Sequence, residues 1–412
     1  MNSGSDFEII SPPVFEEDAV FEDNSAAFFD ADADGDLDLY VGSGISSNNQ
    51  SDTNKDRLYL YDNGKYVGSN MVIPDNSLVT STVQPYDYDL DGDTDLFIGN
   101  LSDPKSFGKR VNSYLLRNNG NGTFEKDKAF QLESMVTNAL WKDINGDGIK
   151  DLLVASEWDL PHVFLNNKGT LSEVALPDDL KGLWQSIDAR DVDGDGDLDL
   201  LLGNLGLNTK FNLYFDGPLQ LYYSDFDKNG VFETMIAYNR DGNYYPLNSK
   251  DELAAQMNVI NKIYTSHEAY AGKTMVEVMK SGTLKEATKY EANTLSSGYV
   301  PNEDGRFSTF IPFARDLQLG PINDFQNVRV SNEDLLLVSG NSYKFNTYHG
   351  SYSSLKGSFW NTDTQEIYNG SELGLDPLNE QVKKVAVIKM EDYHLLIIIS
   401  NNDATKCYQF KN

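Results

Sequence analysis

The stretch FFDADADGDLDLYVG, residues 28–42, decides the fold of this chain. Five aspartates lie within nine positions, and apolar β-forming residues follow at once. Like charges at this density repel one another and would destabilise a folded chain unless a cation lay among them. The stretch therefore predicts a cation-binding loop at the mouth of a strand.

The same pattern recurs along the chain. The first aspartates of the copies lie at 30, 87, 143, 191 and 225, so the early copies are separated by about the length of one four-stranded propeller blade. Strand-like apolar runs flank each copy, so each acidic loop is expected to join two strands. The further copies are YDYDLDGDTDLFIGN from Tyr86, KDINGDGIKDLLVAS from Lys142, RDVDGDGDLDLLLGN from Arg190 and the weaker SDFDKNGVFETMIAY from Ser224.

A second hairpin follows the first three loops, which gives four strands per unit. Asn/Gly turns separate the strand-like runs of these hairpins. They are RLYLYDNGKYV from Arg57, SYLLRNNGNGTFE from Ser113 and HVFLNNKGTLSEV from His162. Two late segments, RVSNEDLLLVSG from Arg329 and IKMEDYHLLIIIS from Ile388, keep the strand frame without the acidic ligands.

Counting these units predicts an all-β, seven-bladed β-propeller in a single domain over residues 1–412. The terminal strand KCYQF and the N-terminal segment DFEII, residues 6–10, are expected to pair and close the ring, which hides the sheet edges. The interval from Asp191 to Asp225 is too short for an ordinary blade. The fifth loop belongs either to a compressed unit or to the outer hairpin of the fourth.

One segment departs from the strand pattern. NSKDELAAQMNVINKIY, from Asn248, carries a capping-box pair in Ser249 and Glu252. Four apolar residues at helical spacing line one face of this segment: Leu253, Met257, Ile260 and Tyr264. Helical character continues through about Glu291, which predicts a helical insertion over residues 249–292.

Oxygen ligands recur at positions 1, 3, 5 and 9 of each loop, with a glycine at position 6 and a backbone carbonyl available at position 7. This spacing lets one short loop surround a hard cation with six or seven oxygens, the coordination that Ca²⁺ prefers over Mg²⁺. Position 12 is apolar in every copy, which excludes an EF-hand because that loop needs a glutamate there. The predicted ligands at positions 1, 3, 5, 7 and 9 are Asp30, Asp32, Asp34, Asp36 and Asp38; Asp87, Asp89, Asp91, Asp93 and Asp95; Asp143, Asn145, Asp147, Ile149 and Asp151; Asp191, Asp193, Asp195, Asp197 and Asp199; and Asp225, Asp227, Asn229, Val231 and Glu233.

The alternative is that these loops are solvated acidic turns, an alternative that weighs more for the fifth loop, where neutral Asn229 replaces a carboxylate. Charge repulsion within the other loops argues against it. Because four side chains of each loop already surround the ion, little coordination is left open for a substrate. We expect the calcium to rigidify each hairpin.

The composition excludes several partners. The chain has 64 acidic and 33 basic residues and a formal net charge of −31, which argues against nucleic acid or an anionic membrane surface as a partner. No apolar run approaches the length of a membrane span. The N-terminus carries no export signal, so the signal of an exported form is expected to lie outside this chain.

The loop pattern D-x-D/N-x-D-G-x-x-D followed by a strand resembles the FG-GAP or VCBS repeat of integrin-α propellers. The run GNLGLNTKFN from Gly203, together with LQLYYSDFDKNG and YYPLNSKDEL, is similar to bacterial relatives of cartilage acidic protein, which often carry an ASPIC/UnbV segment. This resemblance implies a seven-bladed propeller, an extracytoplasmic location at the outer surface or in the periplasm, and a binding role, with the propeller as one module of a longer chain. The last units lack the metal ligands and no ASPIC/UnbV segment is recognisable, which are departures from the family pattern.

The motifs favour binding over catalysis. The four histidines are scattered, and no nucleophile elbow or metalloprotease motif occurs. The chain is therefore predicted to be a non-catalytic calcium-binding module for a glycan or protein ligand, in nutrient capture or surface assembly. The alternative is a calcium-dependent carbohydrate-active enzyme such as a polysaccharide lyase.

Aromatic and amide side chains at predicted strand ends are the candidates for contacting that ligand. Tryptophan beside amides and a carboxylate suits the faces and hydroxyls of a sugar. Packing of the tryptophans in the core is the open alternative. The candidates are Glu157, Trp158, Trp184, Asn204, Asn208 and Lys210.

Overall fold

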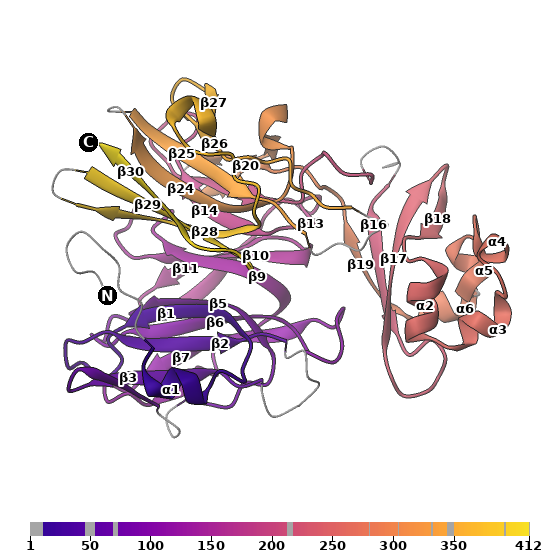
Figure 1. Ribbon diagram of the computed structural model, residues 1–412, viewed down its shortest axis with the longest axis horizontal. Coiled ribbons are helices and arrows are strands. Elements are labelled where there is room, and N and C mark those ends of the chain that lie inside the picture. The colour runs from indigo at the N-terminus through magenta and orange to yellow at the C-terminus, as the bar shows by residue number, and fades with distance from the viewer. Residues whose placement is uncertain are drawn as a thin grey trace. The chain divides into compact units, whose positions relative to one another are not determined.

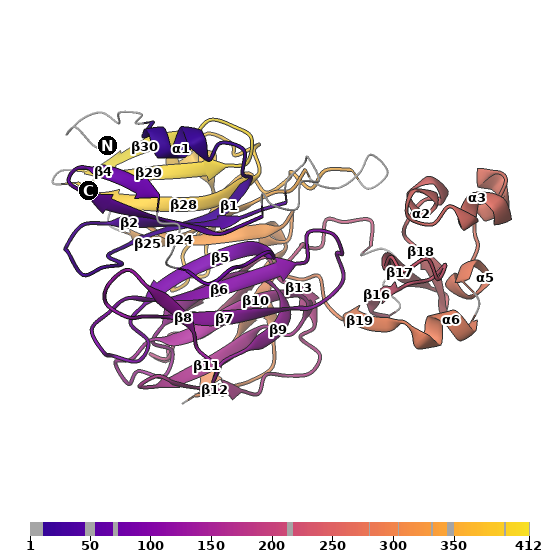
Figure 2. The same ribbon diagram turned by 90° about the horizontal axis from the view of Figure 1, so that it is seen from below.

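Each acidic loop connects two consecutive strands, as the sequence predicts. In four of the five copies the residue before position 1 pairs with position 9 across the hairpin, as Phe29 does with Asp38. Figures 1 and 2 show the computed structural model, in which antiparallel sheets make up most of the chain and the helices are few and short. It describes residues 11–45, 54–68, 73–211, 217–279, 281–303, 305–330, 333–343, 350–390 and 393–411.

The chain divides into two units. The first comprises residues 1–141 with 166–171, and the second comprises 142–165 with 172–412. The predicted all-β class, built from antiparallel sheets, is confirmed. The division into seven blades and the single domain over 1–412 stay predictions, and the predicted closing strand at residues 6–10 lies outside the described residues.

The first unit holds the first two acidic loops. Its core gathers buried side chains from both loop-bearing hairpins, among them Phe29, Tyr40 and Leu96. A short helix that the sequence did not suggest, α1 (Pro13–Glu17), places Phe15 against Tyr59. The strands are β1 (Asp23–Phe29), β2 (Asp38–Ser43), β3 (Arg57–Asp62) and β4 (Lys65–Gly68) in one sheet, with β5 (Val79–Tyr86), β6 (Asp95–Ser102), β7 (Val111–Asn118), β8 (Phe124–Lys126) and β9 (Leu132–Lys142) following.

The second unit holds the other loops and both late hairpins. Buried aliphatic and aromatic side chains such as Leu337, Phe359 and Leu396 join the late hairpins into one core. The elements are β10 (Asp151–Asp159), β11 (His162–Asn167), β12 (Thr170–Val174), β13 (Gly182–Leu183), β14 (Ser186–Arg190), β15 (Asp199–Gly203), β20 (Gly298–Val300), β21 (Asn302–Glu303), β22 (Arg306–Phe307), β23 (Ile311–Pro312), η2 (Arg315–Leu317), β24 (Ile322–Val330), β25 (Glu333–Gly340), β26 (Ser358–Trp360), β27 (Ile367–Asn369), η3 (Gly370–Leu373), β28 (Val382–Lys389), β29 (Tyr393–Ser400) and β30 (Lys406–Lys411).

The sheet β14-β15-β20-β23 is interrupted in sequence. Leu202 of β15 pairs with Gly298 of β20, and the chain between them forms its own sheet, of order β18-β17-β16-β19, with helices packed on it (Figure 1). The fifth acidic loop lies here, between β16 and β17. The elements are β16 (Leu219–Ser224), β17 (Glu233–Arg240), β18 (Asn243–Pro246), α2 (Lys250–Gln256), α3 (Val259–Ile263), α4 (His267–Tyr270), α5 (Met275–Met279), α6 (Ser281–Glu286) and β19 (Thr288–Ala292).

The helical segment begins as expected and ends earlier than expected. The side chain of Ser249 accepts from the N–H of Glu252, whose carboxylate accepts from the Ser249 N–H in return, so the capping box is present. The four predicted apolar residues, Leu253 to Tyr264, are all buried in one cluster. Residues 288–292 form β19 and not helix, because β16 offers a free edge with which Thr288–Ala292 pairs.

Candidate metal sites

A glycine fixes the geometry of each acidic loop. The N–H at position 6 donates to the carboxylate at position 1 with N···O distances of 2.8–3.1 Å in all five copies. Gly35 has a φ of 93°, a conformation that side-chain-bearing residues rarely adopt. The donor and acceptor pairs are Gly35 and Asp30, Gly92 and Asp87, Gly148 and Asp143, Gly196 and Asp191, and Gly230 and Asp225.

The side chain at position 5 folds back onto the loop. It accepts the N–H of position 7 over 2.7–3.0 Å, which directs one of its oxygens to the backbone. The position 7 residues thus contribute a backbone N–H to the loop. The pairs are Asp34 and Asp36, Asp91 and Asp93, Asp147 and Ile149, Asp195 and Asp197, and Asn229 and Val231.

The carboxylate at position 9 closes the loop through a hydrogen bond to the backbone at position 2. It accepts the N–H of position 2 over 2.7–3.2 Å in every copy, and it is buried in every copy. In three loops its other oxygen accepts a backbone N–H from a residue further along the chain. These second donors are Tyr61 to Asp38, Asn118 to Asp95 and Asn302 to Asp199.

An asparagine that the sequence analysis missed holds the position 2 carbonyl. Asn118 donates its amide to the carbonyl of Ala31, in the loop of the preceding sheet, over 2.9 Å. Asn166 does the same to Tyr88 over 2.9 Å, and Asn302 to Ile144 over 3.0 Å. Each of these asparagines precedes a turn glycine by two or three residues, which is the only local signal of their role. We call them the latch asparagines.

Four of the loops bring three carboxylates together. One oxygen from each of three residues lies within 4.8 Å of the others in these clusters. The clusters are Asp30, Asp32 and Asp38; Asp87, Asp89 and Asp95; Asp191, Asp193 and Asp199; and Asp225, Asp227 and Glu233. The third loop has Asn145 at position 3, and its amide donates to Asp147 over 3.2 Å.

Buried carboxylate oxygens without a hydrogen-bond partner make the first, second and fifth loops compatible with a bound cation. Such oxygens occur, within the described residues, on Asp30, Asp32, Asp89, Asp227 and Glu233. A buried carboxylate oxygen without a partner is costly, and a cation is the group that satisfies several such oxygens at once. In the second loop an arginine shares the charge, since Arg117 lies 3.1 Å from Asp89.

Burial raises the pKa of several of these carboxyl groups. Desolvation is the largest cause for Asp95, whose pKa rises to about 7, and the nearby Asp89 and Asp91 raise it further. The pKa values of Asp38 and Asp199 are raised as well, again chiefly by burial. A bound cation would offset this penalty on the ionised form.

The residues predicted to contact a glycan or protein ligand lie in different surroundings. Trp184 is completely buried and donates its Nε1–H to the Leu180 carbonyl, and Trp158 is 3% exposed. Both positions agree with the alternative that these tryptophans pack in the core. Asn204 is also buried, and its amide donates to the Thr294 carbonyl over 3.1 Å.

The remaining candidates are more accessible. Glu157 is partly buried and accepts from Gln185 over 2.9 Å. Asn208 is exposed and donates to the Leu319 carbonyl over 3.2 Å. Lys210 is exposed and lines a cavity of about 300 Å³. A ligand site at these positions stays a prediction.

Comparison with known proteins identifies the repeat in part of the chain. Residues 143–202 match the model of the FG-GAP-like repeat, a segment that contains the third and fourth acidic loops. The resemblance to FG-GAP repeats is thereby confirmed for this segment, and the relation to ASPIC/UnbV-associated proteins stays a prediction. No curated protein sequence matches the chain.

Two solved structures are similar in outline. The first, a crystal structure of BBS1N in complex with ARL6DN soaked with lead, has 10% identity and a TM-score of 0.32, covering 95% of this chain and 92% of that one. The second, YCF48 bound to D1 peptide, has 7% identity and a TM-score of 0.33, covering 95% and 93%. Similarity at this level carries no argument about function.

Proposed function

We propose that this chain is a calcium-loaded, FG-GAP-type β-propeller that serves as a non-catalytic binding or interaction module outside the cytoplasm. The buried, unpartnered carboxylate oxygens in the acidic loops carry the calcium part of the proposal. The FG-GAP-like repeat at residues 143–202 supports the binding role. Calcium sites of extracellular modules are commonly filled at the high calcium concentrations found there.

In this proposal calcium stabilises the sheets and does no chemistry. Each loop would hold its ion through side chains at positions 1, 3, 5 and 9, which leaves little room for a substrate on the metal. Position 9 also anchors the loop to its own sheet, and a latch asparagine anchors position 2 to the next one. A loop that holds calcium would therefore stabilise the contact between its own sheet and the next one.

The resemblance to FG-GAP repeats supports the proposed location, and the net charge limits the possible partners. The net charge of −31 argues against nucleic acid and anionic membrane surfaces as partners, and no helix among the described residues is long and apolar enough to cross a membrane. We propose a glycan or a protein as the ligand, in nutrient capture or in assembly at the cell surface, with the chain acting as one module of a larger protein or complex.

Calcium titration of matched variants tests the metal sites. Asp32→Ala removes the ligand side chain at position 3, where one oxygen is buried without a partner, whereas Asp36→Ala changes an exposed residue whose side chain is not a predicted ligand. We expect Asp32→Ala to lose one bound calcium by calorimetry and Asp36→Ala to keep it. Calcium at a hundred times its dissociation constant should stabilise the protein by about 2.7 kcal/mol per loop. An unchanged melting temperature after chelation would refute calcium loading.

One group of side chains favours the carbohydrate-active enzyme as a second candidate. On β24 the buried Asp324 accepts from Lys384 of β28 over 2.7 Å, and burial and the nearby Asp188 of β14 raise its pKa. Two carboxyl groups and a lysine are components of general acid–base catalysis. Release of unsaturated or shortened products from uronate polysaccharides, abolished in Asp324→Asn, would support the enzyme against the binding module.

A further inference from the structure

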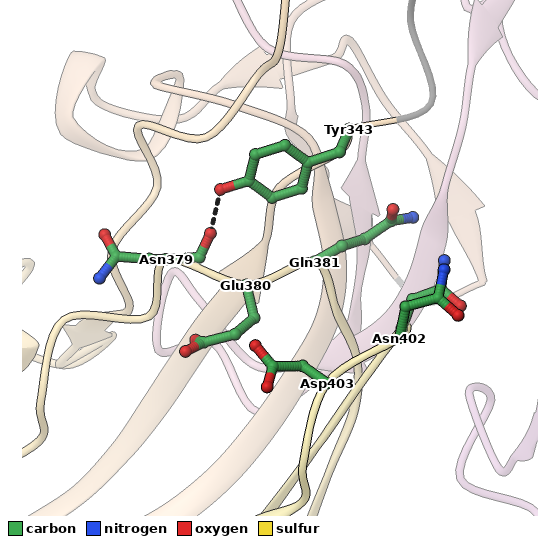
Figure 3. Close-up of a pocket in the computed structure, with 7 residues that line it drawn as sticks. Tyr343, Asn379, Glu380, Gln381, Asn402 and Asp403 are labelled. Carbon is green, nitrogen blue, oxygen red and sulfur yellow. Dashed lines mark hydrogen bonds between the residues drawn. The ribbon is translucent and has the colours of Figure 1, made fainter.

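A polar cavity lies away from the acidic loops, at the ends of β25, β28 and β29. Its volume is about 410 Å³, within the usual range of small-molecule sites. It is formed by Tyr343 after β25, by residues 379–381 before β28, and by the turn 401–403 between β29 and β30 (Figure 3). In the repeat these are the strand ends opposite to those that carry the acidic loops.

Unpartnered amide groups line this cavity. Gln381 is 7% exposed, and its side chain makes no hydrogen bond with any described residue, although its backbone carbonyl accepts from Asn401. The side chains of Asn401 and Asn402 likewise make none within the described chain, and both line the cavity. Figure 3 shows the Gln381 amide extending toward the turn that carries Asn402. Amides that make no hydrogen bond within the protein keep their donors and acceptors available, so these side chains can bind a ligand in the cavity.

An aromatic ring completes the lining. The Tyr343 hydroxyl donates to the backbone carbonyl of Asn379, which holds the ring at the cavity (Figure 3). Tyr343 remains 49% exposed, so part of the ring is open to a ligand. A tethered aromatic ring beside amides offers an apolar surface and hydrogen bonds together.

The charges in the cavity nearly cancel. Glu380 forms an ion pair with Lys406, whose pKa is raised by this bond and by nearby carboxylates that include Asp403. Lys356 donates to the side chain of Asn379 over 2.7 Å. The carboxylates of Glu380 and Asp403 also line the cavity, and one Glu380 oxygen is buried without a partner. A bound cation could use these carboxylates and the amide oxygens but would leave the amide NH₂ groups unpaired, whereas hydroxyl groups can donate to the carboxylates and both donate to and accept from the amides.

We propose that this cavity binds a neutral saccharide. Hydroxyl groups would pair with the amides of Gln381, Asn401 and Asn402, and a sugar ring face would pack on Tyr343. The inference rests on the proposed binding role and names its ligand class. Acidic saccharides are disfavoured because the chain as a whole is strongly negative.

Titration with defined oligosaccharides tests the proposal. The probes are neutral gluco-, manno-, galacto- and xylo-hexaoses, a galacturonate hexamer and a lysine-rich hexapeptide. We expect at least one neutral hexaose to bind and the other two probes not to. Asn401→Ala, at an exposed turn, and Gln381→Met should each weaken binding on the order of tenfold, and Tyr343→Ala at least as much. Gln326→Met, on β24 outside the cavity, is the matched control and should bind as the parent does.

The outcomes separate this proposal from the calcium proposal. Thermal melting confirms that each variant is folded. If Gln381→Met does not fold, Asn401→Ala still tests the cavity. Absence of neutral hexaose binding, binding that the cavity variants leave unchanged, or binding of the peptide in the cavity would each overturn the saccharide proposal. No cavity residue is a predicted calcium ligand, so saccharide binding should not depend on calcium. The titration is therefore run both with calcium and after chelation. An unmoved melting temperature on chelation would refute only the calcium loading.

Discussion

At the scale of single residues, the position 2 residue is the point where an acidic loop meets the neighbouring sheet. In the first loop the Ala31 N–H donates to Asp38 of its own hairpin, and the Ala31 carbonyl accepts from Asn118 of the next sheet. Ala31 is completely buried, so neither backbone group can turn to water instead. Ala31 therefore connects the predicted metal ligand Asp38 of its own hairpin to Asn118 of the neighbouring sheet.

The latch asparagine should therefore matter more than its exposed neighbour. Asn118 is 3% exposed and donates to both Ala31 and Thr94, so Asn118→Leu removes one donor from each carbonyl, while the Gly122 N–H still donates to Ala31. We expect a loss of about 1–3 kcal/mol in the free energy of unfolding. Urea denaturation measures it. Asn119→Ala, one residue on, should change stability by about 0.5 kcal/mol or less. Equal effects of the two variants would contradict the latch.

At the scale of elements, the acidic loop with its two strands is a unit that the chain uses in different settings. In the fifth loop Phe226 at position 2 packs on helical residues such as Met257, and one Glu233 oxygen is buried without a partner. The second donor seen in other loops, as from Asn118 to Asp95, has no counterpart for Glu233 among the described residues. The position 9 carboxylate of the fifth loop is therefore held by fewer hydrogen bonds than that of the second loop.

Adding a charge to the fifth loop should strengthen it. Asn229→Asp restores the carboxylate that position 5 has in the other copies. We expect its calcium affinity to rise on the order of tenfold, because ligand charge is a main determinant of affinity in such loops. Calcium titration should show the weakest class of sites tightening. Asn243→Asp adds the same charge on β18 of the same sheet and should leave the titration unchanged.

Local sequence patterns predicted the structural features that depend on residues close together in the sequence. The hairpins, the capping box of Ser249 and the buried helical face were all readable from spacing. The strand β19 was not, because Thr288–Ala292 takes its conformation from the distant edge of β16. The latch asparagines and the cavity at Gln381 were missed for the same reason: their partners lie far away in the sequence.

At the scale of the whole molecule, repulsion among the excess negative charges lowers the free energy of unfolding. Each bound calcium ion cancels two of the 31 net negative charges. Salt screens the remaining repulsion. We expect the metal-free protein to melt at a higher temperature as sodium chloride rises from low to physiological ionic strength, and the calcium-loaded protein to respond less. Scanning calorimetry at several salt concentrations measures both. An equal response of the two forms would mean that charge repulsion within the metal-free loops does not lower the melting temperature.

The interruption of the sheet β14-β15-β20-β23 has a consequence for the order of folding. The hairpin β14–β15 leaves the ribosome long before β20, so its outer edge stays open while the inserted sheet and helices are synthesised. Joining Leu202 to Gly298 closes a long loop, unless the insertion folds first and shortens it. We expect the compact cluster around Leu253 and Met257 to let the insertion fold early. Early folding of the insertion would bring the two halves of the interrupted sheet within reach of each other.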